Sequence, residues 1–580
     1  MPPQWFVRFV STALIALQIV PVAVTSPLMK HQVEELLEDS LLQPRQNDGN
    51  GTVAITGIQA FGIQPRLEIR QLQRNADQWN LYMLGLTRMM AVDQDDRLSY
   101  YQIAGLHGRP YIPWDGVESA PGVDSPGYCT HISNLFLPWH RPYLALYEQV
   151  LYQHVIDAVN TFPAGALRSR YARAALGFRM PYWDWAATPP VGESVWPEIL
   201  QTERIRVEYP NGTRTINNPL FAYRFHPVKP ADFFFNPFAT WNQTMRAPTN
   251  WERNARSQNA IIGPMMDNNR VSFQDRLYNI FTSYDNFTQF GNEAWAVGDI
   301  EHPDSIESLH DGIHGITGSN GHMTYLDYSA YDPVFWLHHT MIDRLFALFQ
   351  NLHDESYVEP MAAQSNTYSV REGSMQDADS PLYPFHSDTS GTPHTAEGVR
   401  RTETLGYTYP ELANNANTST VRSAINRLYG SSAGSSTISR RSTVNGNEKR
   451  SLRPAHSKQR QYQANILSDK HALNGSYAIY IFLGAPPSAD SKSWPTAPNL
   501  AGTHAVFAAL TSQEAEKNRS VKSKTKRMDS DVRVTGTVPL TSMLLDKVAE
   551  GELACLEEAD VEAYLVGKLS WRVAMVCCHL

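Results

Sequence analysis

The sequence has few cysteines, no excess of positive charge and, beyond its first residues, no long uncharged apolar run. Its four cysteines in 580 residues are too few for a disulfide framework, so the fold must depend on buried apolar side chains. The 49 Lys and Arg against 58 Asp and Glu give a net charge of −9, which argues against a nucleic-acid-binding protein that relies on a basic surface. The missing apolar run argues against a stable membrane span in the mature protein.

What the sequence does contain is a large supply of side chains for a core. Hydrophobic residues make up 42% of the chain and aromatic residues 11%, so we expect a globular protein and no global disorder. At about 150 residues per domain, the length predicts about two to four folded units.

The first 26 residues have the layout of a signal peptide. Arg8 precedes an apolar run over 9–24 that ends in small residues and is shorter than the roughly 20 residues of a membrane-spanning helix. We therefore expect 1–26 to direct the protein into the secretory pathway, to the extracellular space or cell wall, with 27–52 as an N-terminal leader. If the apolar segment is instead retained, the protein is cytoplasmic. Seven Asn-x-Ser/Thr sequons fit the secretory hypothesis: Asn50, Asn211, Asn242, Asn286, Asn417, Asn474 and Asn518.

Patterning divides the rest of the chain into three parts. Residues 53–430 are dense in aromatics and helical-period segments, which predicts a mainly α domain with long loops. Residues 431–460 are rich in serine and basic residues with little to bury, and we expect an exposed linker. Beyond it, short β-branched and aromatic stretches such as 476–483, 504–507 and 532–538 predict a smaller β-rich domain over 461–580.

The strongest local signal is a pair of histidines, His310 and His314. Positions four apart share one face of a helix, so the two imidazoles can bind one metal ion, although such pairs also occur on surfaces without a metal. Gly312 and Gly315 each weaken a helix by roughly 1 kcal/mol relative to alanine. We expect a close backbone approach or ligand access to explain these glycines.

A third candidate ligand comes from the adjacent pair His338 and His339. Pro333 suits a helix start, and an apolar helical pattern follows it. Adjacent helical residues point about 100° apart, so only one of the two can face a given metal. The pattern does not choose between them, and the other histidine should lie behind the ligand.

Three histidines form a parallel set upstream. His107 is followed by His131 and His140, which are nine residues apart and would lie on opposite faces of a continuous helix. A turn must therefore separate them if they converge, and Asn134 and Pro138 can supply it. Six histidines without a cluster of thiolates or carboxylates favour a metal that accepts imidazole ligands alone; copper, zinc, iron and nickel all qualify.

These motifs resemble those of the tyrosinase family of type-3 copper proteins, and in particular the fungal tyrosinases. The motifs are His107-Gly, Cys129-Thr-His131, Phe-Leu-Pro-Trp-His140-Arg, His310-x3-His314 and Asp332-Pro-x-Phe-x-x-His-His339. They lie within about 55–410, and a weaker resemblance continues into the C-terminal segments 475–484 and 536–540.

The resemblance implies a mainly α catalytic domain in which a helical bundle core holds two copper ions, with O2 as co-substrate. The implied ligands are His107, His131 and His140 for the first copper and His310, His314 and His339 for the second. It further implies a thioether between Cys129 and His131, with Phe335 packed over the copper site and His338 next to it. The second ring nitrogen of each ligand should bind a backbone carbonyl or a carboxylate such as Asp343.

The implied activity is ortho-hydroxylation of monophenols and oxidation of o-diphenols to o-quinones, as in melanin-type pigment formation. Small phenols such as tyrosine or catechols are the implied substrates. In fungal relatives a glutamate at the position of Glu307, with an asparagine after the first ligand of the second copper, is proposed to hold an activating water. Asp311 takes the asparagine's place here and cannot donate a hydrogen bond when ionised. An o-diphenol or o-aminophenol oxidase therefore remains the alternative function, followed by a non-catalytic O2 carrier. The alternative interpretation of Glu307 is a surface residue of a helix.

The resemblance also implies a latent proenzyme. The C-terminal domain would cover the copper cleft with an aromatic side chain in the substrate position, and Phe507 is the candidate. The pairs Arg440-Arg441 and Lys449-Arg450 are the kind of dibasic site that secretory processing proteases cut, and an exposed, unburied backbone is easily cleaved. We therefore predict proteolytic activation within the linker.

Overall fold

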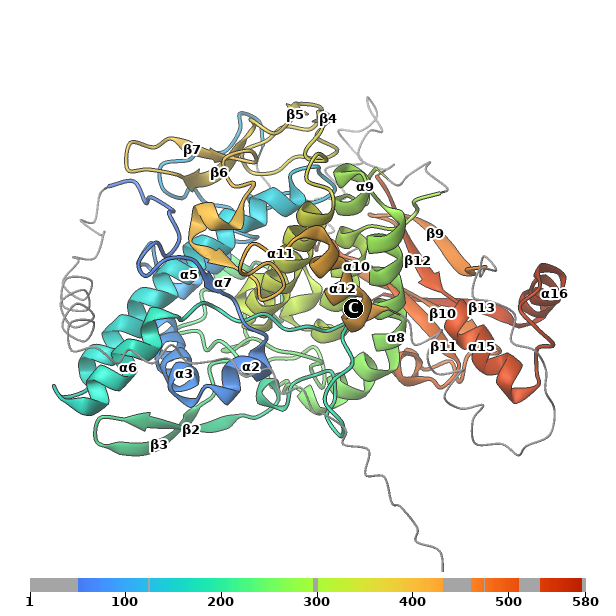
Figure 1. Ribbon diagram of the computed structural model, residues 1–580, viewed down its shortest axis with the longest axis horizontal. Coiled ribbons are helices and arrows are strands. Elements are labelled where there is room, and N and C mark those ends of the chain that lie inside the picture. Colours follow the sequence, from blue (N-terminus) through green and yellow to red (C-terminus); the bar gives the residue numbers. More distant parts are fainter. Residues whose placement is uncertain are drawn as a thin grey trace, which may run out of the picture. The chain divides into compact units, whose positions relative to one another are not determined.

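The computed structural model describes residues 51–123, 126–295, 301–430, 460–473, 475–510 and 532–575 (Figure 1). The expected signal peptide over 1–26, the leader up to residue 50 and nearly all of the linker lie outside the described residues. The domain boundaries that we expect from the sequence therefore remain predictions.

The large domain is built around helices, as the sequence predicts. Its long helices are α3 (Ala76–Met90), α5 (Phe136–Thr161), α8 (Asn259–Ser283), α10 (Ile306–Gly318) and α11 (Val334–Leu352). Shorter helices are α2 (Ile69–Arg74), α4 (Tyr100–Gly105), α6 (Ala166–Leu176), α7 (Pro230–Phe233), α9 (Phe287–Gly291) and α12 (Thr418–Tyr429). Figure 1 shows α10 and α11 in the middle of this domain.

Small two-stranded sheets lie between these helices. The parallel pair is β1 (Gln64–Pro65) with β8 (Tyr407–Thr408). The antiparallel pairs are β2 (Arg204–Tyr209) with β3 (Gly212–Asn217), β4 (Met361–Ala362) with β5 (Met375–Gln376), and β6 (Pro381–His386) with β7 (Pro393–Thr395).

Local sequence determines where the two central helices begin. The Ser305 hydroxyl accepts a hydrogen bond from the Ser308 N–H at 3.1 Å, which caps the start of α10. Pro333 immediately precedes α11, where its fixed φ suits a first helical turn and its missing N–H costs nothing. The helix start predicted at Pro333 is thus confirmed.

The C-terminal part has strands where the sequence predicts them. In one sheet β10 (Tyr477–Leu483) lies between β11 (Leu500–Val506) and β13 (Leu569–Met575), all antiparallel. In a second sheet β9 (Gln463–Asp469) pairs with β12 (Arg533–Pro539). Two helices, α15 (Thr541–Glu550) and α16 (Glu558–Lys568), were not predicted. They bury Leu544 and Val561 in a cluster with Ile481 and Val538, which closes one apolar end of the strands.

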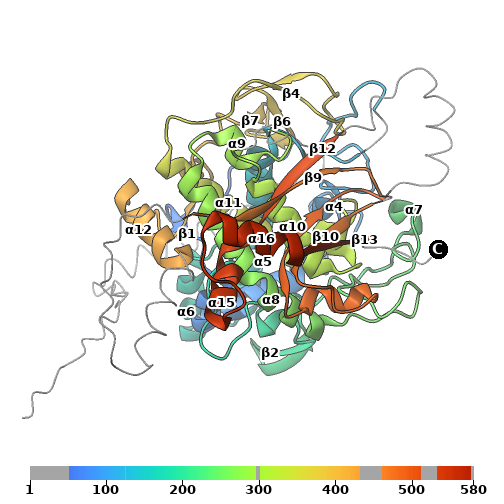
Figure 2. The same ribbon diagram turned by 90° about the vertical axis from the view of Figure 1, so that its right-hand side faces the viewer.

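The C-terminal strands pack closely on α8 and α10 (Figure 2). A Cβ atom on Gly315 of α10 would lie 3.0 Å from the Cβ atom of Ala505 in β11, and one on Gly312 would lie 3.0 Å from the Phe273 ring of α8. Both distances are tighter than ordinary packing. The close backbone approach expected at these two glycines is confirmed.

A buried ionic network joins α5 to α11. Arg66 lies 2.9 Å from Glu148 and 3.2 Å from Asp343, and Arg141 lies 2.8 Å from the other oxygen of Asp343. Tyr407 donates a hydrogen bond to Asp343 at 2.6 Å. Because every charge here has a partner, the network fixes the spacing of two helices that carry site residues.

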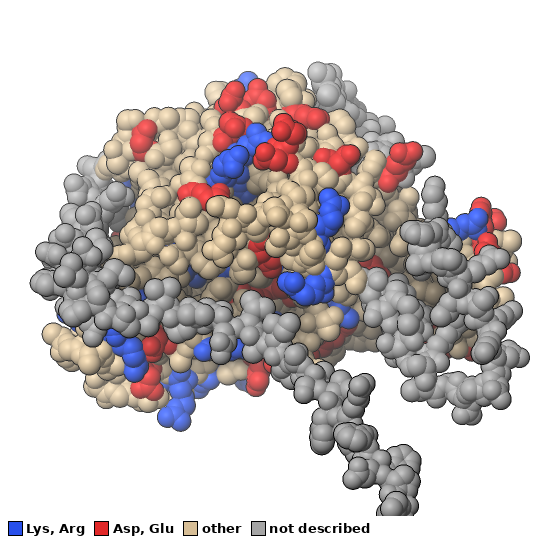
Figure 3. Space-filling model, in the orientation of Figure 1, with Lys and Arg blue, Asp and Glu red and all other residues tan. Residues whose placement is uncertain are grey.

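On the face in Figure 3, acidic and basic side chains are interspersed, with the acidic ones more frequent near the top. Among the described residues, no helix is both long enough and apolar enough to cross a membrane.

Candidate metal centre

The upstream histidines come together in the core. His107, Cys129, His131 and His140 are all buried, and one possible ligand atom from each lies within 4.8 Å of the others. His107 follows α4, His131 lies in the loop before α5, and His140 is in the first turns of α5. Ring centroids lie 5.6 Å apart for His107 and His131 and 5.8 Å for His107 and His140.

The turn predicted between His131 and His140 is present and contains Asn134, but the part predicted for Pro138 is wrong, because this residue lies in the first turn of α5. Ile132 has a positive φ of 48°, and α5 then begins at Phe136. The Asn134 amide is tied down by hydrogen bonds to the carbonyls of Glu359 (2.8 Å) and Gln376 (2.9 Å). The chain reverses over these residues, so both imidazoles face the same space.

The downstream histidines form a second group that faces the first. His310 and His314 lie on α10, and His339 lies on α11. Nε2 of His339 is 3.1 Å from Nε2 of His310 and 3.2 Å from Nε2 of His314. The His339 ring also stacks on His140 of the first group, with centroids 4.4 Å apart. The two groups of buried imidazoles therefore lie next to each other in the core.

Hydrogen bonds set the orientation of several rings. The pairs are His107 Nδ1 with Leu326 O (3.2 Å), His140 Nδ1 with Phe136 O (2.7 Å) and His314 Nδ1 with Met323 O (2.8 Å). A carbonyl oxygen only accepts, so each Nδ1 carries the hydrogen and each Nε2 presents a lone pair to the centre.

Asp343 does not play the part expected for it. Its oxygens accept hydrogen bonds from Arg66, Arg141, Tyr407 and Tyr409, which use its acceptor positions, so the prediction that it orients a histidine is wrong.

These lone pairs can bind a cation. Burial, reinforced in most cases by the neighbouring histidines, lowers the pKa of the six imidazoles, and that of His140 falls to about 4. The rings are therefore neutral near pH 7, which is the form that binds a metal. Within the described residues, His107 Nε2 and both ring nitrogens of His131 have no hydrogen-bond partner. Buried, unpaired and convergent imidazole nitrogens are a donor set that suits copper.

His338 also belongs to the second group, because one of its ring nitrogens lies within 4.8 Å of a possible ligand atom of His310, His314 and His339. Its ring stacks on His310 with centroids 5.0 Å apart and an interplanar angle of 20°. Neither of its ring nitrogens has a hydrogen-bond partner within the described residues, and burial lowers its pKa to about 3. Since His339 faces both His310 and His314 through Nε2, it is the better placed of the adjacent pair. Its role as a ligand remains a prediction.

Phe335 lies between the two groups. Its ring stacks on His339 with centroids 3.9 Å apart and meets His107 edge-on at 4.8 Å. A phenyl ring in this position excludes water and limits the rotation of both imidazoles. Its packing over a copper ion remains a prediction.

Cys129 is a free, buried thiol in the structure. Its Sγ lies 3.3 Å from Nε2 of His140, so the contact recorded here is with His140 and not with His131. Burial raises the pKa of the thiol, and the Glu307 carboxyl adds to the effect. The thioether to His131 remains a prediction.

Glu307 is fully buried beside the centre, so the alternative of a surface helix residue is wrong. One of its oxygens accepts a hydrogen bond from the Ile132 N–H at 2.6 Å and lies 3.3 Å from Nδ1 of His131. The other accepts from the Glu293 N–H at 3.2 Å. Burial, followed by repulsion from the Glu293 carboxylate, raises the pKa of Glu307 to about 8.

A cation from the C-terminal domain lies close to the centre, and no sequence pattern predicts it. Lys470 directly follows β9, is 4% exposed, and places Nζ 2.9 Å from an oxygen of Glu293. Burial alone would lower its pKa, but Glu293, Asp311 and Glu307 together raise it. No spacing or motif in the sequence marks either partner, because the contact joins positions 177 residues apart.

Phe507 enters the centre from the end of β11. Its ring stacks on His314 with centroids 4.2 Å apart and an interplanar angle of 24°. Its N–H donates to Oδ2 of Asp311 at 3.1 Å, while Oδ1 of Asp311 lies 2.9 Å from Nδ1 of His310. Burial, then Glu293, raises the pKa of Asp311. Asp311 thus contacts one imidazole of the centre and the main chain of the segment that covers it.

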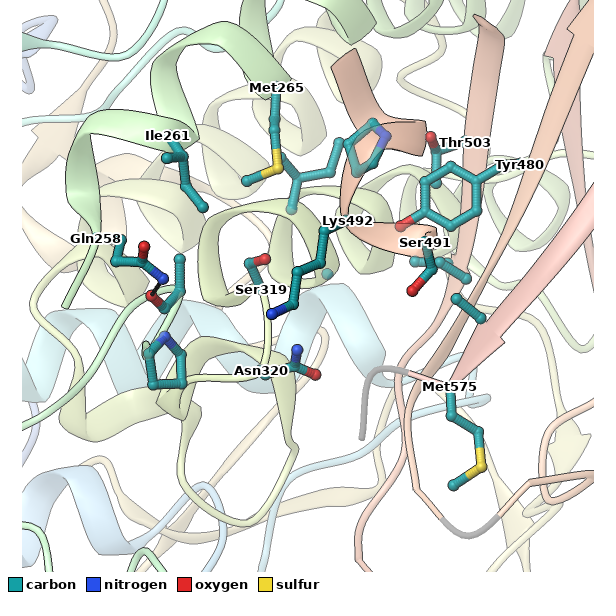
Figure 4. Close-up of a pocket in the computed structure, with 18 of the residues that line it drawn as sticks. Gln258, Ile261, Met265, Ser319, Asn320, Tyr480, Ser491, Lys492, Thr503 and Met575 are labelled. Carbon is teal, nitrogen blue, oxygen red and sulfur yellow. Dashed lines mark hydrogen bonds between the residues drawn. The ribbon is translucent and has the colours of Figure 1, made fainter. Parts of the chain in front are cut away.

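A cavity of about 240 Å³ lies at the seam between the two domains (Figure 4). Ile261 and Met265 of α8 line one side, and Tyr480 and Thr503 of the C-terminal sheet line the other. Its lining includes no histidine, so this cavity is separate from the metal centre.

Comparisons with known proteins agree with this site. Residues 97–352 match the common central domain of tyrosinase, and residues 461–576 match the tyrosinase C-terminal domain. A tyrosinase of Podospora anserina is 35% identical over 87% of this chain and 98% of its own length. A tyrosinase of Neurospora crassa is 32% identical over 90% of this chain and 91% of its own length.

The structure of recombinant mushroom tyrosinase superimposes with a TM-score of 0.73 at 27% identity, over 90% of this chain and 91% of that one. The chain also contains two buried histidine groups suited to a binuclear copper site. It therefore belongs to the tyrosinase family of oxidoreductases.

Proposed function

We propose that the protein oxidises phenols with O2 at a binuclear copper centre, hydroxylating monophenols at the ortho position and converting o-diphenols to o-quinones. The convergence of six buried, neutral imidazoles in the core supports this most directly. We assign the copper ligands as His107, His131 and His140 for the first ion and His310, His314 and His339 for the second. The ions supply the binding and two-electron reduction of O2.

The protein's own groups position the substrate and accept its proton. The ring of Phe507 stacks on His314 and lies close to His131 and His310, so a phenol that replaces it would stack on the same imidazole. Glu307 is held by two backbone N–H groups next to His131, and we assign it as acceptor of the phenol proton through a bound water.

Metal analysis and one substitution test the proposal. We expect about two copper ions per chain, and His310→Ala should abolish both turnover and O2 binding. One zinc ion per chain, with no absorption band on exposure to O2, would contradict the assignment.

An o-diphenol or o-aminophenol oxidase is the second candidate, and Asp311 favours it. The Phe507 N–H donates to one Asp311 oxygen and Nδ1 of His310 lies 2.9 Å from the other, so Asp311 lacks the amide donor that an asparagine would offer to a water. Initial rates on tyrosine and on a catechol, measured after activation, separate the candidates. Turnover of the catechol alone supports the second; reversible O2 uptake with neither substrate oxidised supports an O2 carrier.

We further propose that the protein is made as a latent proenzyme. Phe507 is 1% exposed and occupies the space next to His314, and Lys470 pairs with Glu293 across the same interface. Cleavage in the linker, at Arg440-Arg441 or Lys449-Arg450, would allow 461–580 to leave. Mass spectrometry of secreted protein should then find a C-terminus between about 410 and 450. Full activity of the intact chain, less its signal, would refute latency.

Secretion and the thioether are tested by the same spectra. A mature N-terminus after residue 26 supports the signal peptide, and glycans are expected at the exposed sequons Asn211, Asn242 and Asn417. A bond from Cys129 to His131 replaces one S–H and one ring C–H by C–S, and its two hydrogens pass to O2. The linked peptides should therefore be lighter by two hydrogens.

A further inference from the structure

The cavity at the seam between the two domains has walls from both of them. Ile261 and Met265 of α8, with Ile316 of α10, form the wall from the large domain. Tyr480 of β10 and Met575 of β13 form part of the wall from the C-terminal domain, as Figure 4 shows. This seam cavity, of about 240 Å³, is larger than an apolar cavity of ~150 Å³ that takes up a benzene molecule. It therefore has room for an aromatic ring with a short side chain.

A single positive charge lies at the seam cavity. Lys492 is the only charged side chain among the described residues that line it, and it has no ion-pair partner in the part of the chain that the structure describes. In Figure 4 its ammonium group points toward Ser319 and Asn320, which follow α10. Oδ1 of Asn320 is buried and has no hydrogen-bond partner within the described residues. These groups form a polar end at which an anion would bind a cation that no carboxylate neutralises.

The rest of the lining suits an aromatic ring. Met265 and Met575 contribute thioethers from opposite domains, and Tyr480 contributes a ring. Sulfur and aromatic groups both pack favourably against a bound aromatic ring. A second charge on the ligand would be desolvated here without a partner, because Lys492 is the only ion in the lining. The cavity therefore favours a ligand with one carboxylate and one aromatic ring.

A ligand in the seam cavity would act on the docking of the C-terminal domain. Gly315 and Ala505 both line the cavity, and they belong to the close contact between α10 and β11. The site is complete only when the two domains are together, because each domain supplies one wall. A ligand that binds only the docked form stabilises that form by mass action.

We propose that the seam cavity binds a small aromatic monocarboxylate, and that this ligand holds the C-terminal domain on the large domain. The ligand would keep the protein latent even after the linker has been cut. This regulatory effect depends on the proposed latent proenzyme. Binding in the cavity depends neither on latency nor on copper.

Calorimetry with 3-phenylpropionate on the uncut, copper-loaded protein tests the site. A molecule of this size should bind with a dissociation constant of about 1 mM, from the ligand efficiency typical of such molecules. Lys492→Met keeps the length of the side chain and removes its charge, and it should weaken binding by about tenfold, as for a charge-assisted hydrogen bond. Any binding of the carboxylate at the metal centre would be the same in both proteins.

Lys568→Met is the matched control. Lys568 ends α16 in the same domain, is exposed, and does not line the cavity. Its replacement removes the same charge and should leave the affinity for 3-phenylpropionate at the wild-type value. The neutral analogue 3-phenyl-1-propanol should bind the wild type about tenfold more weakly than the carboxylate does.

A second variant tests the shape of the cavity. Ile261 is 44% exposed, so a larger side chain at this position does not disturb the core. In Ile261→Trp the added ring should occupy the cavity and abolish the binding of 3-phenylpropionate. This result does not depend on the charge of Lys492.

Gel filtration after linker cleavage tests the regulatory effect. The measured quantity is the ratio of the 461–580 fragment that stays with the catalytic fragment to the fragment that is released. At ten times the dissociation constant, 3-phenylpropionate should raise this ratio by about tenfold in the wild type. Lys492→Met should need a correspondingly higher concentration. The readout involves neither copper nor turnover.

The possible outcomes separate the claims. No measurable heat, or equal affinity of the wild type and Lys492→Met, would overturn the site. Binding without greater retention of the fragment, or a fragment that stays bound without any ligand, would overturn the regulatory effect. A protein that binds 3-phenylpropionate as predicted but oxidises no phenol would overturn the proposed function and leave this inference about the cavity intact.

Discussion

Replacement of Lys470 by methionine should release part of the inhibition without any cleavage of the linker. The Lys470 ammonium is buried between the domains, 2.9 Å from Glu293 Oε1, and Glu293 Oε2 has no hydrogen-bond partner within the described residues. Methionine has a similar length and no charge. The variant therefore leaves a buried carboxylate without its cation while the packing volume changes little.

The expected magnitude comes from the loss of one partner of a buried ion pair, which typically costs about 3–5 kcal/mol. This cost falls on the docked state, because Glu293 meets water once the domain has left. With about 3 kcal/mol, and about 1.4 kcal/mol for each tenfold change in an equilibrium constant, the open form should increase by ~10²-fold. The fraction of open protein cannot rise further once the open form is the major form.

The assay is the initial rate of 4-methylcatechol oxidation by uncut, copper-loaded protein. Lys470→Met should raise this rate by up to ~10²-fold over wild type at equal copper content. Lys547→Met is the matched control, because Lys547 pairs with Glu550 on α15 of the same domain, away from the centre. It removes the same charge and should leave the uncut rate at the wild-type value.

Linker cleavage provides an internal check. Once residues 461–580 have been removed, the catalytic fragment of the Lys470→Met variant is chemically identical to that of the wild type, so the two rates must become equal. A folded Lys470→Met variant whose uncut rate equals that of wild type would refute the idea that this ion pair holds the domain in place.

Three further predictions concern the core and the interface. Burial alone would raise the pKa of Asp343, but Arg141 and Arg66 lower it. The ionised carboxylate therefore stabilises the folded protein at a pH above the unfolded-state pKa of this group. This stabilisation is lost as the pH falls through the lowered folded-state pKa. Asp343→Asn should therefore cost about 3 kcal/mol near pH 7 and flatten the acid side of the plot of melting temperature against pH; an unchanged acid limb would count against this network. Gly315→Val should raise the activity of the protein with an intact linker, because a Cβ atom at this position would lie 3.0 Å from the Cβ atom of Ala505 and β11 would have to move. Activity that stays at the level of the wild-type proenzyme would show that the interface between α10 and β11 accommodates the larger side chain. Removal of copper by a chelator should lower the melting temperature, since a metal that binds only the folded state stabilises it, and no shift on metal removal would contradict a resident metal.

Much of the fold could be predicted because its signals are local. The proline before α11, the four-residue spacing of His310 and His314, and the β-branched runs that became β10 and β12 each depend on a few neighbouring residues. The two C-terminal helices α15 and α16 were missed because their apolar faces are short, and they gain their stability from packing on the strands.

In the candidate site, too, features with a local sequence motif could be predicted and long-range contacts could not. The sequence motifs predicted which histidines would converge, and the structure brings all six together. The contacts that connect the centre to the C-terminal domain could not be predicted, because Lys470 with Glu293 and Asp311 with Phe507 are each separated by more than 170 residues. Long-range pairs of single polar residues leave no periodic pattern in a sequence.

The error over Asp343 has a physical cause as well. It was expected to bind the second ring nitrogen of a ligand histidine. Arg66 and Arg141 approach from other elements, and a buried carboxylate is stabilised more by two guanidinium groups than by one neutral imidazole.

We propose that a binuclear copper centre oxidises phenols and that the C-terminal domain keeps this centre closed. Both parts of the proposal can be tested on one protein sample, by measuring copper content and O2 uptake with 4-methylcatechol before and after linker cleavage. We predict about two copper ions per chain at both stages, with O2 uptake that is low before cleavage and rises sharply after it. O2 uptake equal at the two stages, or a chain that binds one zinc ion and consumes no O2, would contradict the account.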